Sequence, residues 1–108
     1  MNVKMLDFSE LEPKIMDAAK LMEMLSQPIR LKILCTLLEG EQSVLSLAAT
    51  AELSQPAMSH HLKKLRDANL VSTRRDGQTI YYSLEGREVA EVLKVLHRLY
   101  CGTLDSSP

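Results

Sequence analysis

The sequence predicts a mainly α-helical fold with a small β-hairpin, a winged helix-turn-helix with the order α-α-α-α-β-β-α. Three observations predict it. Four segments before residue 69 repeat apolar residues at helical spacing, a short turn separates the last two of them, and two β-prone runs joined by Asp76-Gly77-Gln78 follow directly. The length of 108 residues predicts a single domain, 1–108, with an ordered core over about 12–100 and short polar tails.

A proline divides the first two predicted helices. The first covers 12–25, and its apolar face is formed by Ile15, Ala18, Ala19, Met22 and Leu25. Pro28 is tolerated in the first turn of the second helix, 28–39, because the N–H that it lacks would be unpaired there. We expect the buried stripe of this second helix to shield Cys35 from solvent, together with Leu31, Leu34 and Leu38.

Serine N-caps mark the start of the third and fourth helices, 43–51 and 55–68. Ser43 precedes a helix that turns Val44, Leu47 and Ala48 inward, and Ser54 precedes the helix that would enter a DNA groove. At about 100° per residue, the fourth helix buries a stripe and exposes the opposite face. The buried stripe is Met58, Leu62 and Leu65, with His61 at its edge in a structural role; the outward face is Pro56, Ser59, His60, Lys63 and Lys64.

The chain ends in a predicted hairpin and one more helix. The strands are 70–75 and 79–84, and Asp-Gly between them is a strong hairpin signal. The last helix, 87–100, has a broad apolar face, as does the first. These faces either complete the monomer core or pair with a second copy, and we expect a twofold homodimer whose fourth helices reach two half-sites one DNA turn apart. The apolar residues of the last helix are Val89, Val92, Leu93, Leu96 and Leu99.

Charge is distributed unevenly along the chain. The net charge is -1, yet residues 54–84 carry +3 and the remainder therefore -4. A local basic face on an acidic chain is typical of a DNA-binding domain, although a solvated charged surface gives the same count. With 4% aromatic residues and no Trp, the composition argues against reading single strands by base stacking. No apolar run reaches the about 18 residues of a membrane span, and the first residues lack a signal-peptide pattern, so we expect a cytoplasmic protein.

Three segments, MLSQPIRLKIL, SVLSLA and LSQPAMSHHLKKLRDANLVSTRRDGQTIYYSL, resemble the ArsR family of bacterial winged-helix repressors over roughly residues 18–100. The resemblance implies a homodimeric repressor that binds an inverted repeat in double-stranded DNA and releases it when an inducer changes the dimer geometry. Pro56 departs from the small polar residue that many relatives have, which removes one donor. The implied base-reading residues are Gln55, Ser59 and His60, and those for the DNA backbone or the wing are Lys63, Lys64, Arg74, Arg75, Gln78 and Thr79.

Many members of this family sense metals through cysteines in the third helix or a His and carboxylate set in the last. Residues 42–47, QSVLSL, offer no thiolate, and the last helix has only His97, so we expect neither a metal nor another cofactor. Cys35 and Cys101 instead stand at the two positions of the dithiol subgroup typified by BigR, SqrR and HlyU. The resemblance implies that reactive sulfur species, as persulfide or polysulfide, or oxidants crosslink the two thiols and weaken DNA binding.

Other functions stay open on the residues alone. Cys35 has the properties of an unreactive small hydrophobe, and the inducer of an ArsR-type repressor can also be a metal or metalloid at a non-standard site. An architectural DNA binder would need no inducer. A thiol-dependent enzyme using Cys101 with His97 is the remaining class, and we do not expect an enzyme because the chain has no Cys-x-x-Cys and no phosphate-binding glycine loop.

Overall fold

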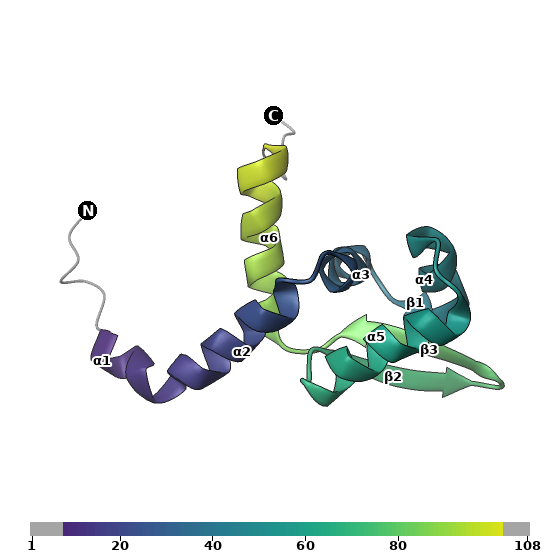
Figure 1. Cartoon of the computed structure of the whole chain (residues 1–108), viewed down its shortest axis with the longest axis horizontal. Coiled ribbons are helices and arrows are strands. Elements are labelled where there is room, and N and C mark those ends of the chain that lie inside the picture. Colours follow the sequence, from purple (N-terminus) through teal and green to yellow (C-terminus); the bar gives the residue numbers. More distant parts are fainter. Residues whose placement is uncertain (1–7, 103–108) are drawn as a thin grey trace.

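The computed structural model describes residues 8–102, and the polar tails predicted at the two ends fall mostly outside the described residues, in 1–7 and 103–108. Helices α3, α4 and α5 gather around a small sheet, whereas α2 and α6 extend away from it (Figure 1). Within the described range no helix is long and apolar enough to cross a membrane. The elements are α1 (Phe8–Leu11), η2 (Glu12–Lys14), α2 (Ile15–Leu25), α3 (Pro28–Leu38), β1 (Gln42–Ser43), α4 (Val44–Ala51), α5 (Gln55–Asp67), β2 (Val71–Asp76), β3 (Thr79–Leu84) and α6 (Arg87–Cys101).

The N-terminal helix begins earlier than predicted and is interrupted. Pro13 lies in the short 3-10 turn η2, which separates α1 from α2, because proline lacks the N–H that a continuous α-helix requires. Along α2 only Leu25 is buried, and Ile15 and Met22 are 46% and 50% exposed. Apart from Leu25, the predicted apolar face of this helix therefore points outward in the single chain.

Helix α3 buries a face that is rotated from the predicted one: Leu34 is buried as predicted, Leu31 and Leu38 are partly buried against the core, and Cys35 is not buried. Its buried residues are Ile33, Leu34 and Leu37, and Cys35 is exposed. The expectation that Cys35 is shielded was therefore wrong. Successive helical residues are rotated by about 100°, so a core centred on residues 33, 34 and 37 turns position 35 toward solvent.

Helices α4 and α5 begin at the predicted serines. The Oγ of Ser43 accepts a hydrogen bond from the backbone N–H of Ser46 at 3.1 Å, and the Oγ of Ser54 accepts one from Ala57 at 3.2 Å. Each cap satisfies one of the unpaired N–H groups of a helix start. The buried stripe of α5 is also as predicted, since Met58, Leu62 and Leu65 have no exposed surface.

The wing is a three-stranded antiparallel sheet of order β1-β3-β2 rather than a hairpin alone. Strands β2 and β3 pair from Val71 with Leu84 to Asp76 with Thr79. Gly77 has a φ of +65° at the first of the two turn positions, as a type II′ turn requires. The two residues of β1 pair with Tyr82 and Tyr81 of β3. Strand β1 was not predicted, because two residues show no alternating pattern.

The core joins the end of α2, α3, α4, α5, the start of β2 and the first half of α6. Val89 and Leu93 are the residues through which α6 enters it. Beyond them α6 leaves the core, and Leu99 and Tyr100 are 71% and 83% exposed. The fully assembled cluster is Leu25, Ile33, Leu34, Leu37, Leu47, Ala48, Met58, Leu62, Leu65, Val71, Val89 and Leu93.

Candidate nucleic-acid interface and thiol pair

Helix α5 presents a polar face opposite its buried stripe. The three predicted base-reading residues, Gln55, Ser59 and His60, are all exposed on its first two turns. Ser54 closes the start of the helix, and Pro56 lies in its first turn, where it breaks no helical hydrogen bond. The arrangement places side chains able to read base edges on a rigid helix end.

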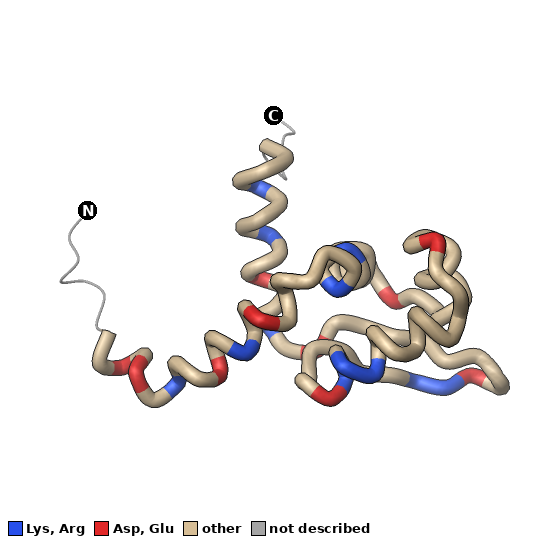
Figure 2. The backbone as a smooth tube through the Cα atoms, in the orientation of Figure 1, with Lys and Arg blue, Asp and Glu red and all other residues tan. Residues whose placement is uncertain are grey.

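Two lysines follow on the same helix. Lys63 forms an ion pair with Asp67 one turn later, with 3.0 Å between Nζ and Oδ2, and both side chains are largely exposed. Such an exposed pair holds Lys63 weakly, so a phosphate can compete for it. Lys64 is also exposed. Figure 2 shows these basic positions on α5 and a second group on β2 near the end of the hairpin.

The two arginines of the wing have different surroundings. The Nε and Nη2 atoms of Arg74 each donate a hydrogen bond of 2.8 Å to the carboxylate of Glu41, and its guanidinium carbon lies 4.5 Å from the ring centroid of Tyr81. The hydrogen bond from Arg74 lowers the pKa of Glu41, and the same bond raises the pKa of Arg74. Arg75 has no ion pair within residues 8–102.

Glu41 was not among the predicted site residues. It lies 33 positions before Arg74 in the chain, and only the pairing of β1 with β3 brings the two together. The remaining predicted wing residues are at the hairpin end, where Gln78 is exposed and Thr79 is half-buried.

His61 lies at the inner edge of α5. Its Nδ1 atom is buried and has no hydrogen-bond partner among the described residues. Burial lowers the pKa of His61, and the positive charges of His60, Arg30 and Lys64 lower it further. The imidazole is therefore favoured in its neutral form, which fits the structural role predicted for it.

The two cysteines lie on helices that pack against each other, α3 and α6. Both are exposed, and Cys101 is the last residue of α6 rather than the first residue after it. Partial burial of the sulfur raises the pKa of Cys35, and the negative charge of a Cys101 thiolate raises it further. The two exposed thiols therefore lie on a pair of packed helices.

No three His, Cys, Asp or Glu residues in the described part of the chain come together as metal ligands. The expectation that this chain does not sense a metal stays a prediction.

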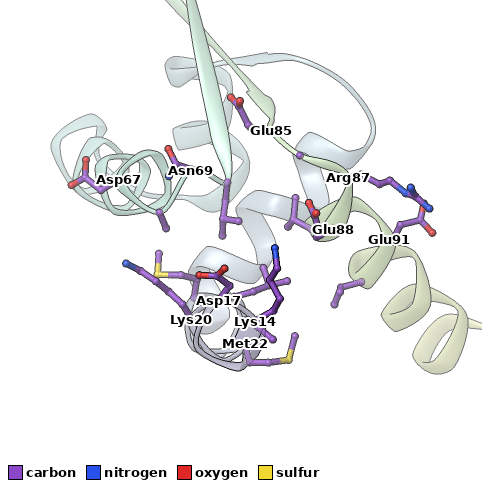
Figure 3. A pocket seen from close by; sticks show the side chains of 18 of the residues that line it. Lys14, Asp17, Lys20, Met22, Asp67, Asn69, Glu85, Arg87, Glu88 and Glu91 are labelled. Carbon is purple, nitrogen blue, oxygen red and sulfur yellow. The ribbon is translucent and has the colours of Figure 1, made fainter. Parts of the chain in front are cut away.

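A groove of about 1050 Å³ separates α2 from the start of α6 and the loop after α5. Lys14, Asp17 and Lys20 line it from the N-terminal side, and Arg87 and Glu88 from α6 (Figure 3). A smaller and more apolar groove of about 490 Å³ lies between the end of α2 and α6, lined by Met22, Leu25, Ser26, Leu31, Val92, Leu96 and Tyr100.

Known proteins share this sequence and architecture. Residues 27–73 match the family described as "Bacterial regulatory protein, arsR family". The chain is 43% identical over 96 residues to the transcriptional activator HlyU of Vibrio cholerae, which covers 89% of each protein. It is 36% identical over 92 residues to the biofilm growth-associated repressor of Xylella fastidiosa, covering 85% of this chain and 81% of that one.

The crystal structure of the transcriptional repressor BigR from Xylella fastidiosa has a TM-score of 0.83 to this fold at 34% identity, covering 89% of this chain and 98% of that one. These relatives regulate transcription, and the prediction of a winged helix-turn-helix regulator rather than an enzyme is confirmed by them. The chain belongs to the arsR family of bacterial regulatory proteins.

Proposed function

We propose that the chain is a homodimeric repressor that binds inverted-repeat operator DNA through α5 and the wing, and that a sulfur bridge between Cys35 and Cys101 releases it. The observation that carries the proposal is the exposure of both thiols on two helices that pack against each other, α3 and α6, in a chain whose recognition helix exposes a row of polar and basic side chains. Because the proposed partner is DNA, we also propose that the protein is cytoplasmic.

Contact with DNA divides between base edges and phosphates. Gln55 offers the amide that pairs bidentately with adenine, while Ser59 and His60 reach neighbouring positions one turn along. Lys63 and Lys64 follow as phosphate contacts, joined by Arg75, Gln78 and Thr79 on the wing. We therefore expect Lys64→Ala to weaken binding to all DNA sequences and to reduce the salt slope by about 1. Gln55→Ala should instead cost about 1 to 3 kcal/mol at one base pair only.

Dimerisation uses the apolar surface that the single chain leaves open. Ile15, Met16 and Met22 on α2 and Leu99 and Tyr100 on α6 are between 46% and 83% exposed. Of these residues, Met22 and Tyr100 line the apolar groove between α2 and α6. Large apolar groups exposed together are typical of a protein interface, and a twofold axis there would give the two copies of α5 the symmetry of an inverted repeat.

The switch starts from the thiols. Cys101 is exposed at the last position of α6, so we assign the first attack to it, and the raised pKa of Cys35 disfavours attack by the Cys35 thiolate. The Cys101 thiolate takes the outer sulfur of a low-molecular-weight persulfide, RSSH, and releases RSH. A second RSSH converts Cys35 to its persulfide in the same way. The Cys101 persulfide anion then attacks the inner sulfur of the Cys35 persulfide, expels HS⁻ and closes a trisulfide.

In sum, two thiols and two RSSH give one trisulfide, two RSH and one H₂S. The bridge ties α3 to α6 and so links the helix before the helix-turn-helix to the proposed dimer helix. A coupling free energy of about 1 to 3 kcal/mol would change DNA affinity by roughly 5- to 150-fold.

Intact-mass analysis tests the switch. The reduced protein is treated separately with glutathione persulfide and with hydrogen peroxide, and the DNA affinity of each product is measured. We expect persulfide to add one sulfur and remove two hydrogens within one chain, with weaker DNA binding. Cys35→Ser and Cys101→Ser should bind DNA like the parent, and persulfide should neither close a bridge in them nor weaken their DNA binding. A single variant that still responds fully would exclude the bridge.

Other inducers remain outcomes of the same experiment. Loss of two hydrogens with peroxide, accompanied by weaker binding, would indicate a disulfide and a general redox switch. No change in mass or affinity with either reagent would leave a repressor with a different inducer, such as a metal or metalloid at a non-standard site.

A further inference from the structure

We propose that the two wing arginines have separate roles: Arg75 contacts DNA, whereas Arg74 is a positioning residue that braces the wing through Glu41 and Tyr81. The proposal rests on the proposed DNA-binding function and deepens it. It assigns a role to Glu41, a residue that lies outside the helix-turn-helix and the hairpin. It also predicts that two adjacent arginines of one strand respond differently to the same substitution.

The register of the sheet places the arginines on opposite faces. Successive strand residues alternate between faces, and directly paired residues share one. Val71 is buried, and Tyr82, the partner of Thr73, packs against the core. Residues 71, 73 and 75 therefore face the helices, so Arg75 lies on the side of the sheet where α5 packs, beyond the end of the core.

Arg74 lies on the other face, in a row that crosses all three strands. Ser43 of β1 pairs with Tyr81 of β3, which pairs with Arg74 of β2. Glu41 continues β1 by alternation onto the same face and holds both donor nitrogens of Arg74 at 2.8 Å. The guanidinium also lies over the Tyr81 ring, 4.5 Å from its centroid, which adds a cation-π attraction. A guanidinium that donates two hydrogen bonds to one carboxylate and also stacks on an aromatic ring has a fixed orientation.

The brace connects the wing to the start of the helix-turn-helix. Glu41 directly precedes β1, and Ser43 at the end of β1 is the N-cap of α4. Strand β2 carries Arg75 toward the hairpin end. Joining Glu41 to Arg74 therefore restrains the wing relative to α4 and α5, so that wing and recognition helix meet one DNA duplex at a fixed spacing.

The assignment is tested by measuring DNA affinity with fluorescence anisotropy at several salt concentrations. The DNA is a duplex that the parent protein has selected from random sequences. The matched variants are Arg74→Lys, Arg75→Lys, Arg74→Ala, Arg75→Ala and Glu41→Ala. Lysine keeps the charge, which suffices for a phosphate, but loses the two-pronged geometry that the brace needs. Thermal unfolding of each variant checks that these exposed substitutions leave the fold intact.

We expect Arg74→Ala, Arg74→Lys and Glu41→Ala to weaken binding alike, by about two- to fivefold, with an unchanged salt slope. The double variant Glu41→Ala/Arg74→Ala should lose no more than either single one. Arg75→Lys should bind like the parent, and Arg75→Ala should reduce the slope by about 1.

Two results would overturn the positioning role proposed for Arg74 and Glu41. Tighter binding by Glu41→Ala would mean that Glu41 competes with DNA for Arg74, and a slope reduced by Arg74→Ala but retained in Arg74→Lys would make Arg74 a phosphate contact. Failure of the proposed DNA-binding function is distinguishable from both, because the parent protein would then select no duplex at all.

Discussion

Removing the cap of the recognition helix should separate folding stability from DNA binding. The Oγ of Ser54 accepts a hydrogen bond of 3.2 Å from the backbone N–H of Ala57. This bond fixes the first turn of α5, which carries Gln55. In Ser54→Ala this N–H loses its partner. The chain provides a matched control in Ser43, which caps α4 with the same geometry at 3.1 Å.

The magnitude follows from the cap alone. Replacing a serine N-cap with alanine costs about 1 kcal/mol, within a range of roughly 0.5 to 2. For a domain of this size 1 kcal/mol lowers Tm by about 4 to 8 °C. We expect Ser43→Ala and Ser54→Ala to lose similar stability, because each leaves one N–H unpaired at a helix start. Only Ser54→Ala loosens the turn that carries a predicted base-reading residue, so it should lower DNA affinity more than Ser43→Ala does.

Two further substitutions at the same position separate the cap from the charge. Ser54→Asn keeps a neutral cap, and we expect parent-like stability and affinity. Ser54→Asp keeps the cap and favours the helix dipole, but it places a negative charge beside the phosphates. Urea unfolding should therefore show a stable Ser54→Asp, while anisotropy should show weakened binding. Equal DNA affinity for Ser54→Ala, Ser54→Asp and the parent would refute the placement of this helix end against DNA.

Three other substitutions test the core, the proposed dimer and His61. Leu62→Ala removes a fully buried side chain from α5 and should cost about 2 to 5 kcal/mol in urea unfolding; a loss below 1 kcal/mol would contradict the packing. Leu99→Asp places a charge on the exposed apolar end of α6, and sedimentation should then show a monomer where the parent is a dimer. His61 has a lowered pKa in the folded chain, so the unfolded chain binds the proton first and the stability present above about pH 6.5 should fall as the pH drops below that value. His61→Gln should flatten this part of the pH profile, and an identical profile would show that another group titrates.

Local signals predicted most of the fold. The serine caps, the stripe of Met58, Leu62 and Leu65, and the turn at Gly77 each depend on residues within a few positions of one another. Sequence spacing reports such features directly, because helix and hairpin geometry relate near neighbours. Contacts between distant segments carry no such signal. The pairing of β1 with β3 and the bond from Arg74 to Glu41 both arise only after the chain has folded back on itself.

The prediction of which face of α3 is buried was wrong for another reason. Leu31, Ile33, Leu34, Leu37 and Leu38 cover about 160° of the helix, and Ile29 and Cys35 widen this apolar arc at its two edges, so spacing alone does not single out its buried centre. Packing against the rest of the core determines which side is buried. Ile33, Leu34 and Leu37 are buried, so Cys35, which lies between them in the sequence, faces solvent. A thiol that was expected to be shielded is therefore accessible to a small reagent.

The exposure of Cys35 determines how a bridge to Cys101 can act on the recognition helix. The buried residues of α3 share one close-packed cluster with Met58, Leu62 and Leu65 of the recognition helix. A close-packed interior resists deformation, so a displacement of α3 is passed on to α5 rather than absorbed. The opposite side of α3 carries the exposed Cys35, and α6, which packs against α3, carries Cys101. We infer that a bridge formed outside the core can act on the recognition helix through α3 without a bound ligand entering the core, which a shielded Cys35 would not permit.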